Sequence, residues 1–416
     1  MVAAAPSTAT SLGYRGNIWR LFAVQALLGF ILWVPIWVVF LQRKGLALTQ
    51  IGVLEGFAWV LTAALEVPTG AIADRFGRKA SIAMGAFLYS VAMFLILADA
   101  LSPGFLLGYA LWNSSMAFVS GADSALLYDS LKAGGRASEA AKQTGRYAAI
   151  QQASQGIASL IGAALATIDI TLCFTICGLT GLAATALVLT VKEPPRREDE
   201  SASPLGYWKN LRTAVGITAR RPIVRALLLL NAAILVMPLV VYYVLLQPYA
   251  IDVGLPLASL GIVVLAVQVT TVAASWLAHR VAGRFELTTI VTAGVVVLIT
   301  ATVILGAFPS IPSIAFMLAV ALVPALVGPL MSARIHDLIP SEQRATILSL
   351  GALLFELGLA IAMPLLLLFA DRLGAPVAIG ISAGLVAVIV IPLLIMWRTA
   401  ERHPVTAATT RPPLIG

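Results

Sequence analysis

The sequence is poor in charged residues, which excludes a large soluble domain. Asp, Glu, Lys and Arg make up 11% of the 416 residues, whereas soluble globular domains carry roughly a quarter. Hydrophobic residues make up 60% of the chain, and its mean hydropathy is +0.96. Such a surface cannot face water, so the sequence predicts an integral membrane protein with little chain outside the bilayer.

Cysteine and histidine are also scarce, which excludes two kinds of site. The two cysteines, Cys173 and Cys177, lie four residues apart in one apolar segment. On a helix they share a face, so we interpret them as packing residues rather than as a disulfide framework. The three histidines form no cluster with metal-ligand spacing. We therefore expect no metal site.

Signatures of strands and of cofactor chemistry are missing as well. Sustained strand-type alternation, which a membrane barrel requires in many segments, is absent. No GxGxxG follows a strand, no glycine-rich phosphate loop precedes a lysine, and no nucleophile–base set is visible. We expect neither an enzyme nor an organic cofactor.

Twelve apolar runs, separated by Gly, Pro and charged clusters, are long enough to cross a bilayer as helices. The fold class is therefore an all-α membrane protein with twelve transmembrane helices in two six-helix halves. The predicted segments are 17–42, 50–73, 80–99, 104–127, 144–168, 171–191, 223–247, 258–281, 286–308, 312–333, 343–370 and 375–398.

One long polar stretch divides the chain into two halves. Its second part predicts an amphipathic helix on the lipid headgroups. The expected domains are an N-terminal tail (1–16), a six-helix bundle (17–191), a linker (192–222), a second six-helix bundle (223–398) and a C-terminal tail (399–416).

The excess of basic residues indicates how the chain is oriented in the membrane. Lys and Arg number 27 against 19 Asp and Glu. If both termini are cytoplasmic, only Arg43, Lys44 and Arg372 lie outside, as the preference of basic residues for cytoplasmic loops requires. The charge is spread over many loops instead of one face, so we expect no nucleic acid partner.

The loop after the second predicted helix carries a dense motif, Gly70-Ala-Ile-Ala-Asp74-Arg75-Phe-Gly77-Arg78-Lys79. Gly77 gives the turn its backbone freedom, and Gly70 lets another helix approach closely. A facing helix N-terminus or a guanidinium would stabilise Asp74 at the membrane surface. Arg78 could pair with Asp74 or reach Asp129 or Asp123 at the end of the fourth helix.

In pattern, loop and topology this motif resembles the signature between the second and third helices of the major facilitator superfamily. Two other stretches, Glu66–Gly70 and Ile339–Thr346, resemble its exporter-rich branches. The resemblance implies two halves that rock about a central site, and a motif network that latches the cytoplasmic side. The expected gate residues are Gly70, Asp74, Arg75, Gly77, Arg78, Lys79, Glu66, Asp123, Asp129 and Arg344. The alternative is that the basic residues only set orientation and contact anionic lipid.

Two departures from the family leave the transport direction open. The fourth helix has no arginine, although many proton-coupled members carry one there. The fifth helix reads Gly156-Ile-Ala-Ser-Leu-Ile-Gly162, without the Gly-Pro pair of the antiporter signature. Its small residues still permit tight packing against the eighth helix.

Carboxylates at membrane depth are functional candidates because burying a charge there is costly. Glu356, near the middle of the eleventh helix, is the first candidate for a proton carrier, and Glu55 in the second helix is the next. The alternative for each is a neutral acid hydrogen-bonded to a neighbouring helix.

Polar and aromatic residues on the expected cavity helices indicate a shared cavity, because buried amides need partners or water. Aromatic and acidic residues without a buried cation suit apolar or cationic organic solutes. The expected cavity residues, besides the two glutamates, are Gln25, Trp33, Trp37, Asn113, Gln151, Gln155, Asn231, Tyr242, Tyr243 and Gln268.

These observations predict a secondary transporter, an antiporter of the multidrug-efflux type that exports small amphipathic or cationic compounds on a proton gradient. The alternatives are an importer of a nutrient by symport or uniport, a membrane enzyme, and a non-transporting sensor of the same fold. We expect a monomer in contact with membrane lipid, in the inner membrane of a bacterium.

Overall fold

The computed structural model describes residues 8–194 and 204–402, and within them the backbone alone at 8–13, 15, 66–68, 70–75, 204–211, 341, 342, 345 and 402. The described residues form helices, turns and bends, without a strand. The predicted all-helical class is therefore confirmed for this part of the chain.

The first half contains eight α-helices and two short 3₁₀ turns. They are α1 (Thr8–Gly29), η1 (Val34–Ile36), α2 (Trp37–Arg43), α3 (Leu48–Phe76), α4 (Arg78–Leu95), α5 (Pro103–Val119), α6 (Ala122–Ala133), η2 (Ala137–Glu139), α7 (Ala140–Leu165) and α8 (Thr171–Leu189).

The second half follows the linker helix α9 (Pro204–Arg220). Its elements are α10 (Pro222–Val240), the π-helical turn η4 (Val241–Leu245), α11 (Leu246–Asp252), η5 (Leu257–Ser259), α12 (Leu260–Ala282), α13 (Leu287–Ala307), η6 (Pro312–Ala315), α14 (Phe316–Leu338), α15 (Ser341–Leu373) and α16 (Ala375–Arg402).

All twelve predicted segments are helical, and nine helices among the described residues are long and apolar enough to cross a membrane. The other three segments correspond to α4, to α5 followed by α6, and to α7. Helix α1 begins at Thr8, within the stretch expected as a tail, and α16 extends to Arg402. The chain is therefore a multi-pass integral membrane protein.

Two predicted segments are interrupted, which corrects their continuous boundaries. The segment 17–42 breaks after Gly29 and resumes through η1, where Pro35 cannot donate a helical hydrogen bond. The segment 104–127 breaks at Gly121, whose positive φ of 76° ends one helix and starts the next.

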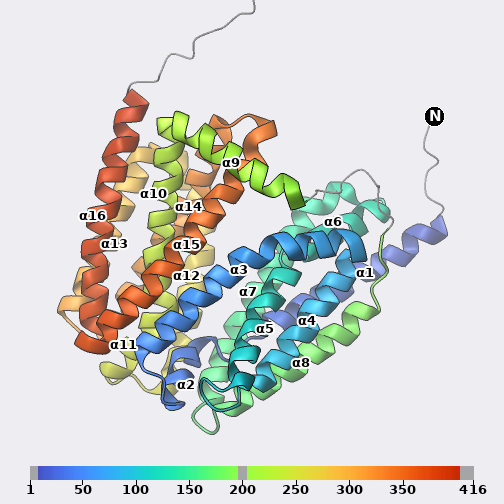
Figure 1. The fold of residues 1–416 in the computed structure, drawn as a ribbon, viewed down its shortest axis with the longest axis horizontal. Helices are drawn as coiled ribbons and strands as arrows, with labels where there is room; N and C mark the ends of the chain where they lie inside the picture. Colours follow the sequence, from blue (N-terminus) through green and yellow to red (C-terminus); the bar gives the residue numbers. More distant parts are fainter. Residues whose placement is uncertain (1–7, 195–203, 403–416) are drawn as a thin grey trace, which may run out of the picture.

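The two halves lie side by side, with α1 and α4–α8 on the right of Figure 1 and α10–α16 on the left. Helix α3 runs between them, and α2 lies at the bottom of the view, in contact with α11. We call the end that holds Gly77, Lys192 and Arg221 the linker end, and the end that holds Gly45 and Gly374 the far end. Helix α9 lies across the linker end, where it contacts both α3 and α15.

Close packing between the halves depends on small residues near the far end. Gly56 of α3 lies so close to α15 that an added Cβ would be 2.7 Å from the carbonyl oxygen of Ala360. Gly261 of α12 approaches the backbone of Ser159 and Leu160 in α7 in the same way. The predicted packing of the fifth helix against the eighth is thus present.

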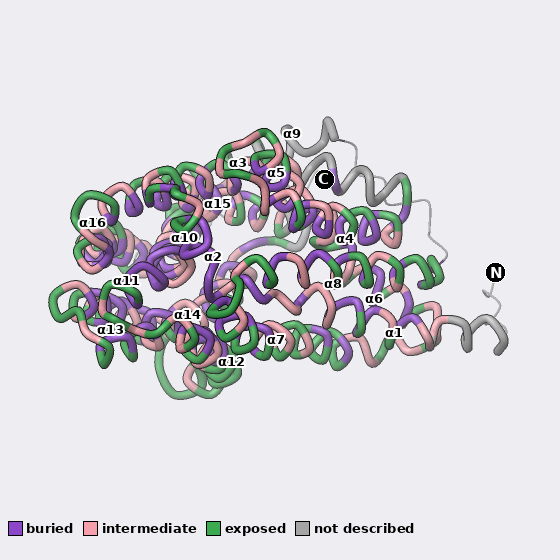
Figure 2. Tube along the Cα trace, turned by 90° about the horizontal axis from the view of Figure 1, so that it is seen from below, coloured by how far each residue is buried: buried purple, intermediate pink, exposed green. Residues whose placement is uncertain are grey.

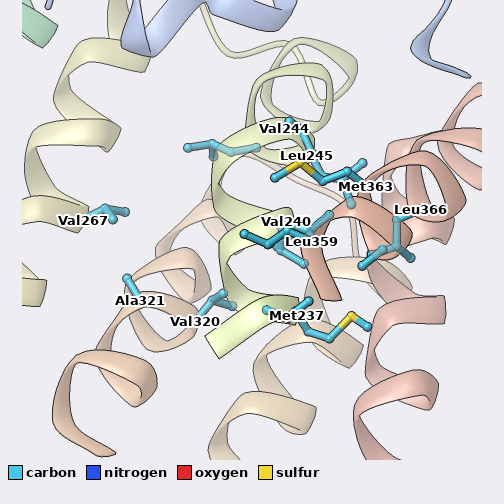
Figure 3. Close-up of a cluster of buried hydrophobic side chains, with 14 of the residues drawn as sticks. Met237, Val240, Val244, Leu245, Val267, Val320, Ala321, Leu359, Met363 and Leu366 are labelled. Atoms are coloured by element: carbon cyan, nitrogen blue, oxygen red, sulfur yellow. The ribbon is translucent and has the colours of Figure 1, made fainter. Parts of the chain in front are cut away.

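Buried residues concentrate where helices face one another, and exposed apolar residues lie at the rim (Figure 2). In the second half, Met237, Val240 and Val244 pack against Leu359 and Met363 (Figure 3). This apolar core adjoins the cavity described next.

Candidate substrate and coupling site

A cavity of about 400 Å³ lies midway along the helices, bounded by α7, α10, η4, α12, α14 and α15. Its polar lining residues are Gln152, Gln155, Tyr242, Gln268 and Thr271. The remaining wall is apolar and includes Phe355, Pro238 and Pro324, and also Val267 and Ala321, which border the core of Figure 3. The cavity is large enough for a small organic molecule.

Gln268 is the most unusual of the lining residues. Its side chain is buried, at 8% exposure, and its Oε1 has no hydrogen-bond partner among the described residues. Asn231 lies on the same face of α10 as Leu235 and Pro238, and its buried Oδ1 is likewise without a partner there. Buried acceptors of this kind are rare and call for an explanation.

The structure brings together only part of the predicted cavity set. Gln155, Tyr242 and Gln268 line the cavity. Gln25 is buried within α1, Gln151 is exposed on α7, and the Asn113 side chain donates to the carbonyl oxygen of Tyr109 in its own helix. The sequence patterns gave no indication of Phe355 or Thr271.

Trp33 and Trp37 lie elsewhere, in an aromatic cluster of the first half. Their ring centroids are 5.5 Å apart, and both rings contact Trp112, at 4.8 and 5.1 Å. Tyr109 stacks on Trp37 at 5.8 Å. These rings are buried, and they are not among the residues that line the cavity. The break after α1 directs them into the helix bundle of the first half.

Glu55 of α3 points into this aromatic cluster. Its Oε1 accepts hydrogen bonds from Trp37 Nε1 at 2.6 Å and from Tyr109 Oη at 2.8 Å, and the residue is only 2% exposed. Both donors are uncharged, so they can hold the carboxyl group in either protonation state. The group is therefore placed where a proton could be gained or lost without breaking an ion pair.

The π-helical turn η4 connects the two sites. It lies between Pro238 and Pro248, and such turns often occur at functional positions. Its Tyr242 lines the cavity, while the adjacent Tyr243 is close enough to Glu55 to interact with it electrostatically. One turn of helix thus faces both the cavity and the buried carboxyl group.

Glu356, the first candidate from sequence, is buried on α15 at 7% exposure. It follows Phe355, which lines the cavity and meets Trp59 of α3 edge-on, with ring centroids 6.0 Å apart. Glu356 is on the same face of α15 as Ala360, which packs against α3. It is therefore at the interface of the halves instead of in the cavity wall.

At the far end, Gln247 of α11 joins the second half to the broken first segment. Its Oε1 accepts from the backbone N–H of Val38 at 2.7 Å, and its Nε2 donates to the carbonyl oxygen of Val34 at 3.0 Å. Thr49 also donates to Asp371 at 2.7 Å between α3 and α15. Sequence reasoning missed Gln247, because its backbone partners become available only through the break.

At the linker end, Arg78 forms an ion pair with Asp129, one of the pairings that the sequence left open. Arg78 also donates to the carbonyl oxygen of Ala125 at 3.0 Å. Gly77 has the positive φ, 110°, that its turn requires.

Glu193, which the sequence analysis did not select, holds the same turn from the other side. Its two carboxylate oxygens accept from the backbone N–H groups of Arg78 and Lys79, each at 2.9 Å. The start of the linker thus caps the N-terminus of α4.

The other gate candidates have separate contacts, and Asp123 is also hydrogen-bonded to the side chain of Tyr147 in α7. Asp123 accepts from the backbone N–H of Ser124 at 2.6 Å, and the exposed Arg344 donates to the carbonyl oxygen of Ile339 at 3.3 Å. The side chains of Glu66, Asp74 and Arg75, together with the surroundings of Gly70, lie outside the described residues.

A helical membrane bundle in two halves, with a cavity at mid-depth that helices of both halves border, is an arrangement typical of membrane transport proteins. The family model of the Major Facilitator Superfamily (MFS_1) matches residues 18–328 of this chain. The chain belongs to this family, and its fold is that of a transporter of small molecules instead of an enzyme. No curated protein matches the chain.

Solved structures of transporters share the fold at low sequence identity. The nucleoside transporter NupG superposes with a TM-score of 0.73 at 12% identity, over 92% of this chain and 99% of that one. The POT family transporter PepTSo gives 0.73 at 14% identity, over 93% and 98%. A bacterial homologue of the lysosomal transporter Spinster, inward-facing and unoccupied, gives 0.71 at 17% identity, over 95% and 98%.

Proposed function

We propose that the protein is a secondary active transporter that exports small amphipathic compounds by alternating access, driven by a proton gradient. The observation that carries the proposal is the mostly apolar cavity at mid-depth, bordered by the interface between two halves. Its amide and hydroxyl groups are few, which suits a mostly apolar compound with a small polar part.

The far end of the bundle is the closed side of this conformation. Gly56 and Gly261 permit close contact between the halves there, and Gln247 adds hydrogen bonds to the backbone of the first segment. We therefore assign the structure to the state that opens toward the linker end. Transport would require the far-end contacts to break while contacts form at the linker end.

Glu55 is the coupling group in this proposal, with Glu356 as the alternative. Glu55 lies beside the far-end closure, bound by the uncharged donors Trp37 and Tyr109, and close to Tyr243 of the cavity turn. Because a charged carboxylate at this depth is costly, its protonation would change the stability of the closed end.

The proposed topology follows the charge distribution of the sequence. The nine long apolar helices and the three further helical segments together make twelve crossings, with both termini, the linker and the motif loop on the cytoplasmic side. A monomer in a bacterial inner membrane completes the proposal.

The decisive experiment measures gradient-driven uptake into inverted vesicles. Compounds are first selected by thermal stabilisation of the purified protein, and their uptake is then followed with and without an imposed pH gradient. Uptake should collapse when the gradient is removed. Uptake that ignores the gradient would refute proton coupling, and accumulation of the compound by whole cells would favour import.

Glu55→Gln tests the coupling group, because the amide oxygen can still accept from Trp37 and Tyr109 but cannot titrate. We expect this variant to retain exchange of substrate across the membrane while gradient-driven uptake falls at least tenfold. Glu356→Gln is the parallel variant. Normal coupling in Glu55→Gln together with lost coupling in Glu356→Gln would move the assignment to Glu356.

A further inference from the structure

The charge of the cavity wall points to the charge of the substrate, an inference that rests on the proposed function. Among the residues that the structure describes, the lining contains no Asp, Glu, Lys, Arg or His. Glu55 and Glu356 are both absent from the lining, and the first is bound by Trp37 and Tyr109. A buried ion needs a counter-charge at this depth, and the described wall offers none.

One of the hydrogen-bonding groups of the cavity wall has no partner among the described residues. Gln268 presents a buried Oε1 that accepts no hydrogen bond from any described residue, although it lines the cavity. The Gln268 side chain already shares a hydrogen bond with Tyr242, which leaves its Oε1 unused by the described residues. Gln152 and Gln155 line the same space with amides that can both donate and accept. Leaving a buried acceptor unsatisfied is costly, so a ligand that donates a hydrogen bond to Oε1 of Gln268 is favoured.

We propose that the cavity binds an uncharged, compact amphipathic solute whose N–H or O–H group donates a hydrogen bond to Oε1 of Gln268. The apolar part of the solute lies against Phe355, Pro238 and Pro324. This narrows the solute class of the sequence analysis, because organic cations find no counter-charge in the wall.

The test measures binding in detergent, where no gradient or flux is needed. The probes are four matched compounds: phenylacetamide, which is neutral and has donors; its N,N-dimethyl analogue, which has none; phenethylammonium, a cation; and phenylacetate, an anion. The corresponding naphthyl compounds form a larger second set. Thermal stabilisation and the dissociation constant are measured for each compound with the purified full-length protein.

We expect the primary amides to stabilise the protein and the other three members of each set to bind at least tenfold more weakly. Gln268→Leu should weaken amide binding about tenfold, which corresponds to one lost hydrogen bond. Gln143→Leu is the matched control, since Gln143 of α7 is also buried with an Oε1 that has no partner in the described part of the chain, but it does not line the cavity. That variant should bind the amides normally.

Two further variants keep the proposal testable if Gln268→Leu fails to fold. Gln268→Asn withdraws the acceptor by one methylene group and should weaken amide binding. Gln268→Glu supplies a negative charge and should shift preference toward phenethylammonium.

The proposal is overturned if the cation or the anion binds best, if the dimethyl amides bind as well as the primary amides, or if no amide in either set binds. Amide binding without gradient-driven uptake would refute the proposed transport and leave this inference standing. Gradient-driven transport of a cation would support the proposed transport and refute this inference.

Discussion

At the scale of single residues, two buried polar side chains of this protein, Glu55 and Gln247, are held by uncharged partners. Glu55 accepts from an indole and a phenol, and Gln247 bonds to backbone groups. Bonds of this kind exchange more readily than buried ion pairs, whose separation exposes two charges. Such residues can therefore stabilise one conformation without preventing the other.

Gln247→Leu is expected to weaken the closure of the far end. The variant leaves the N–H of Val38 and the carbonyl of Val34 without the partner they have now, which costs about 1–3 kcal/mol. The far end should then open more often. The measurement is the rate at which a thiol reagent labels Leu46→Cys, a far-end position that is 4% exposed.

The control for this prediction is Gln42→Leu, an exposed amide at the same end of the molecule. It should leave the labelling rate of Leu46→Cys unchanged. If Gln247→Leu and Gln42→Leu behave alike, Gln247 does not hold the far end closed.

Some residues expected in the cavity line it and others lie elsewhere, for a physical reason. Tyr242 and Gln268 were expected in the cavity and line it. Trp33 and Trp37 have the same polar–aromatic character, yet their rings fill the core of the first half beside Glu55. A side chain's type does not reveal which way a broken helix turns it.

At the scale of helices, small residues determine how closely the elements approach. Gly162 of α7 lies directly against the carbonyl oxygen of Leu32, at the break between α1 and η1. Cys177 of α8 accepts a hydrogen bond from the backbone N–H of Leu32, with 3.4 Å between the two atoms, so it does more than fill space. The break is thus stabilised by α7 and α8.

Gly162→Ala should destabilise the folded protein by about 1–3 kcal/mol, because the added methyl group overlaps the Leu32 carbonyl and the backbone must shift. The measurement is the apparent melting temperature in detergent. Gly145→Ala, in the same helix with open space around the position, is the matched control. It should leave stability unchanged or raise it by up to about 1 kcal/mol. Equal melting temperatures for the two variants would contradict the close approach.

The helices themselves were predictable, and their interruptions were not. Apolar runs of about twenty residues identify the segments because the bilayer sets their length. The break at η1 depends on contacts with Gly162 and Cys177, which lie more than a hundred residues away in the chain. Local sequence shows only Pro35, and several other prolines, such as Pro364 in α15, lie inside unbroken helices.

At the scale of the whole molecule, the two ends of the bundle differ in what holds them. The far end joins the halves by glycine-mediated contacts and by the bonds of Gln247 and Thr49. The linker end carries the Arg78–Asp129 pair, which lies within the first half, and the Glu193 cap, which joins the first half to the start of the linker. The family resemblance predicts that the motif forms a latch. That the contacts at the linker end act as this latch stays a prediction.

A cross-link at the far end tests alternating access directly. Thr49 of α3 and Asp371 of α15 are hydrogen-bonded at 2.7 Å and lie on opposite halves. The variant Thr49→Cys/Asp371→Cys should therefore form a disulfide under mild oxidation, while Cys173 and Cys177, both fully buried, should not react. If transport requires the far end to open, the oxidised protein should lose substrate flux and recover it on reduction.

The same protein should keep its binding site when it is cross-linked, because the cavity lies at mid-depth and is lined by neither Thr49 nor Asp371. Thermal stabilisation by a bound compound should therefore persist after oxidation, which separates a locked conformation from a misfolded one. Each single-cysteine variant should transport equally under oxidising and reducing conditions. Normal flux through the fully cross-linked protein would mean that the halves need not separate at this end. That result would refute the rocking mechanism.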